Sequence, residues 1–187
     1  MFTAGKLRQE NIAEYLLYMW QVEDLIRACG MDIERIKSSV VEPLPLDAGQ
    51  KQELLQWYAE LIDMMRLEGV SGRGHLQINK NVLIQLTDLH LMLLKSVKYP
   101  EYTAEFYRTL PIIVELRAKS GEEKPGEIEA CFNALYGMLV MRLQKRAITE
   151  ETQKAMAQIS RFVSMLATYY HKDKKEPLFG KEDYDNL

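Results

Sequence analysis

The sequence lacks the features that mark several large classes of protein. Its 187 residues include two cysteines, Cys29 and Cys131, that are far apart and form no CxxC pair, and three histidines. This scarcity argues against a disulfide framework and against a zinc-finger site. The first residues, MFTAGKLRQEN, lack the apolar stretch of a signal peptide, and no run approaches the roughly 18 apolar residues of a membrane span. We therefore expect a cytoplasmic protein that does not interact with membranes.

An excess of basic residues is missing as well. The chain has 24 lysines and arginines against 27 aspartates and glutamates, which gives a formal net charge of −3. Nucleic-acid-binding domains usually carry a basic balance or a basic stripe, so we expect no nucleic-acid partner. The 47% hydrophobic and 27% charged residues are ordinary for a globular chain, and the length fits one domain.

Helical periodicity is what the sequence has in abundance. Residues 82–97, VLIQLTDLHLMLLKSV, are apolar around most of a helical circumference, so this helix should be surrounded by others. No segment alternates with the period of a strand. We predict an all-α, single-domain bundle of six or seven helices around a central buried helix at about residues 76–97. The domain should span residues 1–175, followed by a polar tail at 176–187 that is mobile or loosely docked.

The expected helices follow the apolar stripes and their capping residues. Asp47, with Gln50 three residues on, forms a capping box, and Pro111 should kink or split the helix that contains it. The predicted helices lie at about residues 6–29, 31–41, 47–69, 76–97, 101–119, 127–146 and 149–175.

Four polar residues at or near buried positions are candidates for an internal site. Glu23 lies on the apolar stripe of the first helix, where a carboxylate must be paired, hydrogen-bonded or protonated. The favoured interpretation is an ion pair with Arg27, four residues later. In the sharper alternative, Glu23 meets His90 of the central helix, and these residues with Arg27 and Thr87 form an internal polar site for a small ligand.

The link GVSGRGH, residues 69–75, is rich in glycine. Glycine loops that precede helices can bind phosphate, and here Arg73 and His75 would attract an anion. The link lacks the lysine and the preceding strand of a P-loop, and helix capping accounts for its glycines. An anion site at Arg73 and His75 is therefore only a hypothesis.

Motifs for catalysis or metal binding are not found. No histidine follows a glutamate at the Glu-x-x-His spacing of di-iron bundles, and the two cysteines lie near apolar stripes, as buried thiols usually do. We expect no metal, no cofactor and no catalytic residue, and we favour a protein that is not an enzyme.

A resemblance is carried by residues 11–36, NIAEYLLYMWQVEDLIRACGMDIERI. This opening helix, dense in tyrosine and tryptophan, is similar to the start of a family of small all-helical proteins from Bacteroidetes bacteria, catalogued as a domain of unknown function. The resemblance implies a cytoplasmic helical protein and implies no reaction, ligand or catalytic residue.

Two functional classes remain open. In the first, the protein is an interaction or scaffold protein that contacts its partner through its tyrosine, tryptophan and methionine side chains. The partner would be another protein or a second copy, because the helix at 127–146 has both an apolar face and a stripe of small residues at Ala130, Ala134 and Gly137. The alternative is a small-ligand-binding bundle with its pocket near His90 and Glu23.

Overall fold

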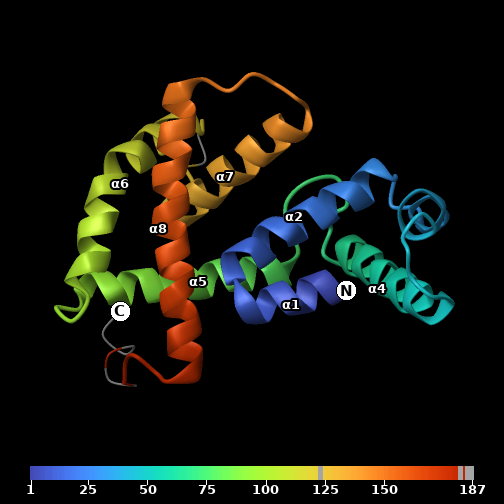
Figure 1. Cartoon of the computed structure of the whole chain (residues 1–187), viewed down its shortest axis with the longest axis horizontal. Coiled ribbons are helices and arrows are strands. Elements are labelled where there is room, and N and C mark those ends of the chain that lie inside the picture. The colour runs from blue at the N-terminus through green and yellow to red at the C-terminus, as the bar shows by residue number, and fades with distance from the viewer. Residues whose placement is uncertain (122–123, 181–182, 184–187) are drawn as a thin grey trace. The chain divides into compact units, whose positions relative to one another are not determined.

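The computed structural model is all-helical, which confirms the predicted fold class (Figure 1). It describes residues 1–121, 124–180 and 183, in which there are eight α-helices and no strand. None of the helices in this part of the chain is both long enough and apolar enough to span a bilayer. The α-helices are α1 (Phe2–Glu10), α2 (Ile12–Ala28), α3 (Ile33–Ile36), α4 (Ala48–Leu67), α5 (Gln77–Lys95), α6 (Pro100–Lys119), α7 (Glu127–Leu143) and α8 (Glu150–Lys175), and a π-helical turn, Lys37–Val41, follows α3.

The chain divides into two compact units. The first consists of Met1–Gln9 and Glu14–Asn81, and the second of Glu10–Ala13 and Val82–Leu187. The expectation of one domain over residues 1–175 stays a prediction. The helix count exceeds the predicted six or seven because the first predicted helix is broken at Asn11. The side chain of Asn11 accepts a hydrogen bond from the Ala13 N–H, as an N-cap residue does, and starts α2 anew.

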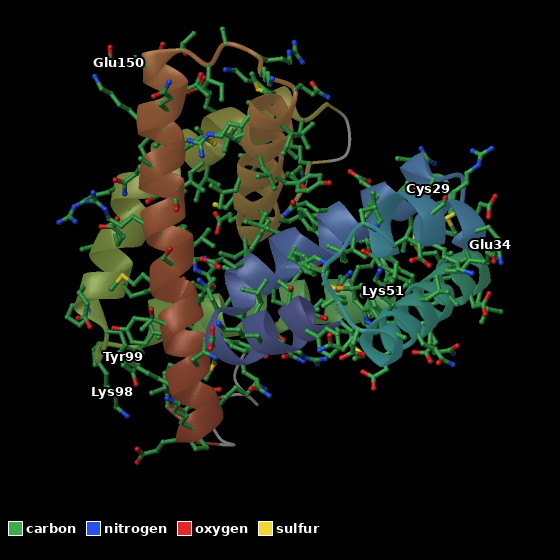
Figure 2. The ribbon with its side chains drawn as sticks, turned by 45° about the vertical axis from the view of Figure 1, so that its right-hand side comes forward. Cys29, Glu34, Lys51, Lys98, Tyr99 and Glu150 are labelled. Atoms are coloured by element: carbon green, nitrogen blue, oxygen red, sulfur yellow. The ribbon has the colours of Figure 1, made fainter. Side chains whose placement is uncertain are left out.

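In the first unit, α3 and the π-helical turn pack against α4. The predicted capping box at the start of α4 is present, with Asp47 and Gln50 each accepting a hydrogen bond from the other's backbone N–H. Figure 2 labels Cys29 just after α2, Glu34 in α3 and Lys51 in α4. The buried face of α4 comprises Leu54, Tyr58, Leu61, Ile62 and Met65.

In the second unit, α6, α7 and α8 pack against one another in pairs. Phe132 of α7 and Phe162 of α8 are fully buried among them. Helix α6 runs through Pro111 without a break, so the predicted split into two helices does not occur. Glu150 begins α8, and Tyr99 lies near its other end, where the Tyr99 ring contacts that of Tyr169 (Figure 2).

Helix α5 is less completely buried than its sequence predicts. Ile84 and Leu91 are 53% and 41% exposed, whereas Met92, assigned by periodicity to the polar strip, is buried. Ile84 and Leu91 lie two helical turns apart and share an exposed face with Asp88. The helix therefore has one mixed apolar and polar face in contact with solvent.

The start of the C-terminal tail is anchored. Phe179 is 9% exposed and its ring lies 5.7 Å from that of Tyr99, while the Leu178 N–H donates a hydrogen bond to Asp173. In the tail predicted to be mobile or loosely docked, Phe179 is therefore an apolar contact with the helical part of the chain. The rest of that prediction falls on residues 181–182 and 184–187, which lie outside the described residues.

Within the second unit, Ile12, the first residue of α2, is hydrogen-bonded to a histidine of α8. The Ile12 N–H donates a hydrogen bond of 3.0 Å to Nε2 of His171 on α8, so this nitrogen must be unprotonated. Burial, aided by the positive charge of Lys175, lowers the pKa of His171. Its folded-state pKa is thus below its unfolded value, so its contribution to stability is present above about pH 6.5 and is lost as the pH falls through the folded-state pKa.

We therefore predict that acidification from pH 7 to pH 5 destabilises the wild-type protein more than a His171→Gln variant. The glutamine amide oxygen can accept the Ile12 N–H bond but does not titrate. Urea unfolding at both pH values measures the two free-energy differences. Equal losses in the two proteins would contradict a titrating bond at His171.

Candidate functional site

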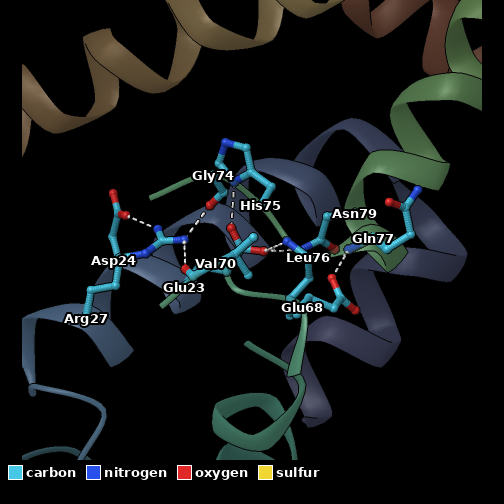
Figure 3. Close-up of polar contacts among 10 residues, drawn as sticks. All are labelled: Glu23, Asp24, Arg27, Glu68, Val70, Gly74, His75, Leu76, Gln77 and Asn79. Carbon is cyan, nitrogen blue, oxygen red and sulfur yellow. Dashed lines mark hydrogen bonds and ion pairs between the residues drawn. The ribbon is translucent and has the colours of Figure 1, made fainter. Parts of the chain in front are cut away.

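A buried carboxylate forms the centre of a polar cluster in the first unit (Figure 3). Glu23 of α2 has no exposed surface, and both of its oxygens accept hydrogen bonds. Oε2 lies 2.6 Å from Nδ1 of His75, and Oε1 accepts bonds from the Leu76 N–H (2.9 Å) and the Asn79 side-chain amide (2.7 Å). We call Glu23, Arg27, His75, Leu76 and Asn79 the Glu23 cluster. Its carboxylate meets the requirement that a buried charge be hydrogen-bonded.

Helix α2 places Trp20, Glu23 and Arg27 along one side, because residues three and four apart share a helical face. The Trp20 ring stacks on the imidazole of His75, with centroids 4.2 Å apart and planes inclined by 15°. His75 is thus held at its face by an indole and at Nδ1 by a carboxylate, which together fix its orientation.

Arg27 holds the link that precedes α5. Its guanidinium donates hydrogen bonds to the carbonyl oxygens of Val70 (3.1 Å) and Gly74, and forms an ion pair with Asp24 at 2.7 Å. Gly74 has a φ of +84°, a conformation that favours glycine. The predicted Glu23–Arg27 pair is therefore wrong, because the two terminal nitrogens of the arginine donate to the link and to Asp24, while its buried Nε has no partner among the described residues.

The beginning of α5 receives two carboxylates from other helices. Glu23 accepts from the Leu76 N–H, and Glu68, just after α4, accepts from the Gln77 N–H at 2.6 Å. The first N–H groups of a helix have no partner within it, and negative charge there interacts favourably with the helix dipole. Glu23 and Glu68 thus cap α5 from elsewhere in the chain.

The geometry also defines what His75 can do chemically. A carboxylate accepts hydrogen bonds, so Nδ1 of His75 carries a proton and donates it to Glu23, and Nε2 is the ring nitrogen that does not face the carboxylate. The His75 side chain is 31% exposed and its ring extends away from Glu23 (Figure 3). The contacts of the His75 ring thus fix the direction of Nε2. Within the described ranges, no three His, Cys, Asp or Glu residues form a group that would hold a metal ion.

His90 belongs to a separate polar group in the second unit. Its Nδ1 lies 2.7 Å from the Tyr102 hydroxyl and its Nε2 lies 3.4 Å from Oε2 of Glu127. The Phe106 and Phe162 rings lie edge-on to the imidazole, at 4.9 and 5.8 Å between centroids. Burial lowers the pKa of His90, against the opposing effect of Glu127. The neutral ring therefore accepts from Tyr102 and donates to Glu127.

The hypothesis that Glu23 meets His90 is wrong, because each residue has other partners. Thr87 does not join either group, since its hydroxyl donates to the Leu83 carbonyl of its own helix. The structure brings Glu23 and Arg27, from the predicted internal polar site, together with His75, from the predicted anion site. Arg73 is exposed on the link, and an anion site there stays a prediction.

Sequence reasoning missed Asn79 and Trp20. Asn79 is completely buried, and its amide oxygen has no hydrogen-bond partner in the described part of the chain. Asn79 is the third residue of α5, beyond the N-cap position that asparagine favours, so its burial has no signal in the sequence. The stacking of Trp20 on His75 left no trace in helical periodicity.

Comparison with known families adds one finding. The model of the family described as "Domain of unknown function (DUF4924)" matches residues 1–177. The chain belongs to the DUF4924 family. Comparison with curated proteins and with solved structures gives no match. The match covers the Glu23 cluster and the His90 group of this DUF4924 chain alike, and it confirms the resemblance to a domain of unknown function.

We predict that Glu23→Gln destabilises the DUF4924 chain by about 2–4 kcal/mol, because an amide cannot accept all three bonds and leaves a buried donor unsatisfied. His75→Phe, which retains an aromatic ring against Trp20, should be strongly non-additive with Glu23→Gln. Urea unfolding of the two single variants and the double variant measures the coupling.

His90→Leu provides the matched control for this cycle. It also removes an imidazole, but His90 shares no partner with Glu23, so the effect of His90→Leu should add to that of Glu23→Gln within about 0.5 kcal/mol. Additivity between Glu23 and His75, or coupling between Glu23 and His90, would contradict the contacts described above.

Proposed function

We propose that this DUF4924 protein is a non-enzymatic interaction protein of the cytoplasm of a Bacteroidetes bacterium, and that it acts as a homodimer. Its two free cysteines fit a reducing compartment. The observation that carries the proposal is an exposed apolar stripe along α6. The partner is a second copy of the chain, in contact through this stripe.

The α6 stripe consists of five exposed residues at alternating steps of three and four: Ala104, Tyr107, Pro111, Val114 and Ala118. Tyr107 is 63% and Val114 is 54% exposed. The opposite side of α6 is buried in its own unit through residues such as Phe106 and Ile113. Steps of three and four residues are the spacing by which one helix packs against another. A continuous exposed apolar surface of this kind is typical of an interaction site.

The charges beside the α6 stripe favour a second copy as the partner. Arg108 and Glu115 lie on the same side of the stripe, at nearly equal distances in sequence from Pro111. Within the chain Arg108 pairs with Glu105 at 2.9 Å and Glu115 with Lys119 at 2.5 Å, so a contact across the dimer extends these two pairs. In a two-fold, antiparallel pairing of α6 centred on Pro111, Arg108 lies beside Glu115 of the partner subunit, and the same contact recurs by symmetry. Tyr107 then packs near Val114 of the partner subunit, so both the apolar and the charged residues match.

The stripe of small residues on α7 is a less continuous surface for dimerisation than the α6 stripe. On α7 the stripe of small residues begins at Ala130, which is buried in its own unit, and reaches exposed surface only at Gly137. The alternative function, binding of a small ligand near Glu23 and His90, is less favoured. The carboxylate oxygens of Glu23 and both ring nitrogens of His90 already have partners within the chain.

Light scattering across micromolar concentrations tests the proposal. The wild-type protein should show twice the 21.7 kDa mass of one chain. Tyr107→Glu should weaken association by at least about 100-fold, because it places an uncompensated charge in an apolar contact. Arg108→Glu alone should weaken it less, and Arg108→Glu combined with Glu115→Arg should restore it, because the pair is then reversed on both sides.

Leu67→Glu provides the matched control. Leu67 is 87% exposed at the end of α4, so the same type of substitution there should leave the dimer intact. Thermal unfolding of each variant shows whether the subunit itself remains folded. A monomeric wild-type protein, or a dimer that tolerates Tyr107→Glu, would contradict the proposal.

A further inference from the structure

A groove between α1 and α4 in the first unit is separate from the α6 stripe. It has a volume of about 300 Å³, and it adjoins a second, more open depression of about 690 Å³ along α4. Trp57 and Glu60 of α4 line both hollows. The groove is otherwise mostly apolar, and its lining includes Tyr15, Met19, Leu61, Met64 and Ile78. Aromatic and methionine side chains of this kind adapt to apolar ligands.

Negative charge lies next to the indole of Trp57. Glu53 and Glu60 are four residues before and three residues after Trp57, and all three side chains line the open depression. Both glutamates are exposed, and neither forms an ion pair with any described residue, although Glu60 accepts a hydrogen bond of 3.1 Å from the Gln56 side-chain amide. An aromatic face with nearby carboxylates attracts organic cations through the ring quadrupole and through charge. Two basic groups also line this region. The Arg8 guanidinium lies over the ring of Tyr15, and Met1, which carries the N-terminal amine, lines both hollows; burial lowers the pKa of that amine to about 6.

A glycine lies at the edge of the groove. Gly5 is in the interior of α1, where glycine is less favourable than residues with a side chain. It lines the groove, and a Cβ atom built at this position meets nothing within 4 Å. Packing against a neighbouring group therefore does not explain the glycine. Because Gly5 is exposed and lines the groove, a side chain at position 5 has open space at the edge of the groove.

We propose that this groove binds a small organic cation of the alkylammonium type. The ammonium head lies against the Trp57 ring between Glu53 and Glu60, and the alkyl tail occupies the space next to Gly5, over Met19 and Met64. The three observations on which the site rests are a mostly apolar groove, an aromatic ring flanked by two carboxylates that form no ion pair, and a helix-interior glycine that lines the groove.

Titration with butyltrimethylammonium chloride, at ionic strength held constant with sodium chloride, tests the site. Trp57 is half-buried whereas Trp20, the second tryptophan, is almost fully buried, so a saturable change in tryptophan fluorescence reports on the groove. Pentanoate, which has an alkyl tail but the opposite charge, should produce no saturable change. The double variant Glu53→Gln, Glu60→Gln should bind the cation about fivefold more weakly or worse, in line with two charge contacts at an exposed site.

Gly5→Leu should weaken binding at least tenfold, because leucine fills the groove, and it should raise the thermal stability of the protein because leucine favours a helix. Weaker binding together with higher thermal stability would show that Gly5→Leu blocks the groove and does not cause misfolding. Gly137→Leu is the matched control: Gly137 is also in a helix interior with open space around it, but it lies on α7. It should bind the cation as the wild type does. Equal binding of pentanoate, wild-type affinity in Gly5→Leu, or no saturable change at all would overturn the proposal.

Discussion

A carboxylate cannot remain in an apolar interior unless hydrogen-bond donors replace the water that it loses, and in this chain that requirement falls on Glu23. Its donors come from His75, Leu76 and Asn79, more than fifty residues further along the sequence. Satisfying one charge therefore fixes the end of the glycine-rich link and the first turn of α5 against α2. Arg27 reinforces the arrangement, because its guanidinium binds two carbonyl groups of the same link.

Glu23 and His90, two of the buried polar residues in the described part of the chain, differ in electrostatic character. A further buried pair, Glu105 and Thr109 of α6, is hydrogen-bonded to Gln158 of α8 within the second unit. Glu23 is stabilised by donors on every side, whereas His90 is surrounded by aromatic rings and is held neutral by burial. The carboxylate oxygens of Glu23 and both ring nitrogens of His90 are hydrogen-bonded to other groups of the chain. The side chains that remain available for partners are at the surface, on α6 and around Trp57. For this reason the proposed functions rest on exposed residues, and the buried groups are assigned to the architecture of the fold.

Local patterns in the sequence predicted the helical class, the capping box at Asp47 and most helix positions, because those depend on residues within a few positions of each other. The same patterns identified Glu23 as a buried carboxylate that needs a partner. They could not identify that partner, because the contact with His75 depends on how a flexible link folds back onto α2. The exposure of Tyr107 and Val114 was hidden for a similar reason. Periodicity shows that α6 has apolar residues on more than one side, but only packing decides which side stays uncovered.

The central claim is that Glu23 holds the start of α5, and amide hydrogen exchange followed by NMR tests it most directly. The Leu76 N–H should be protected in the wild-type protein through its bond to the Glu23 carboxylate, although it lies at the end of a glycine-rich link. In Glu23→Gln that protection should fall by at least about tenfold, which corresponds to loss of one buried charge-assisted bond. Amides in the middle of α8 should keep their wild-type rates. A Leu76 amide that exchanges like an exposed loop in the wild type, or that keeps its protection in Glu23→Gln, would contradict the claim.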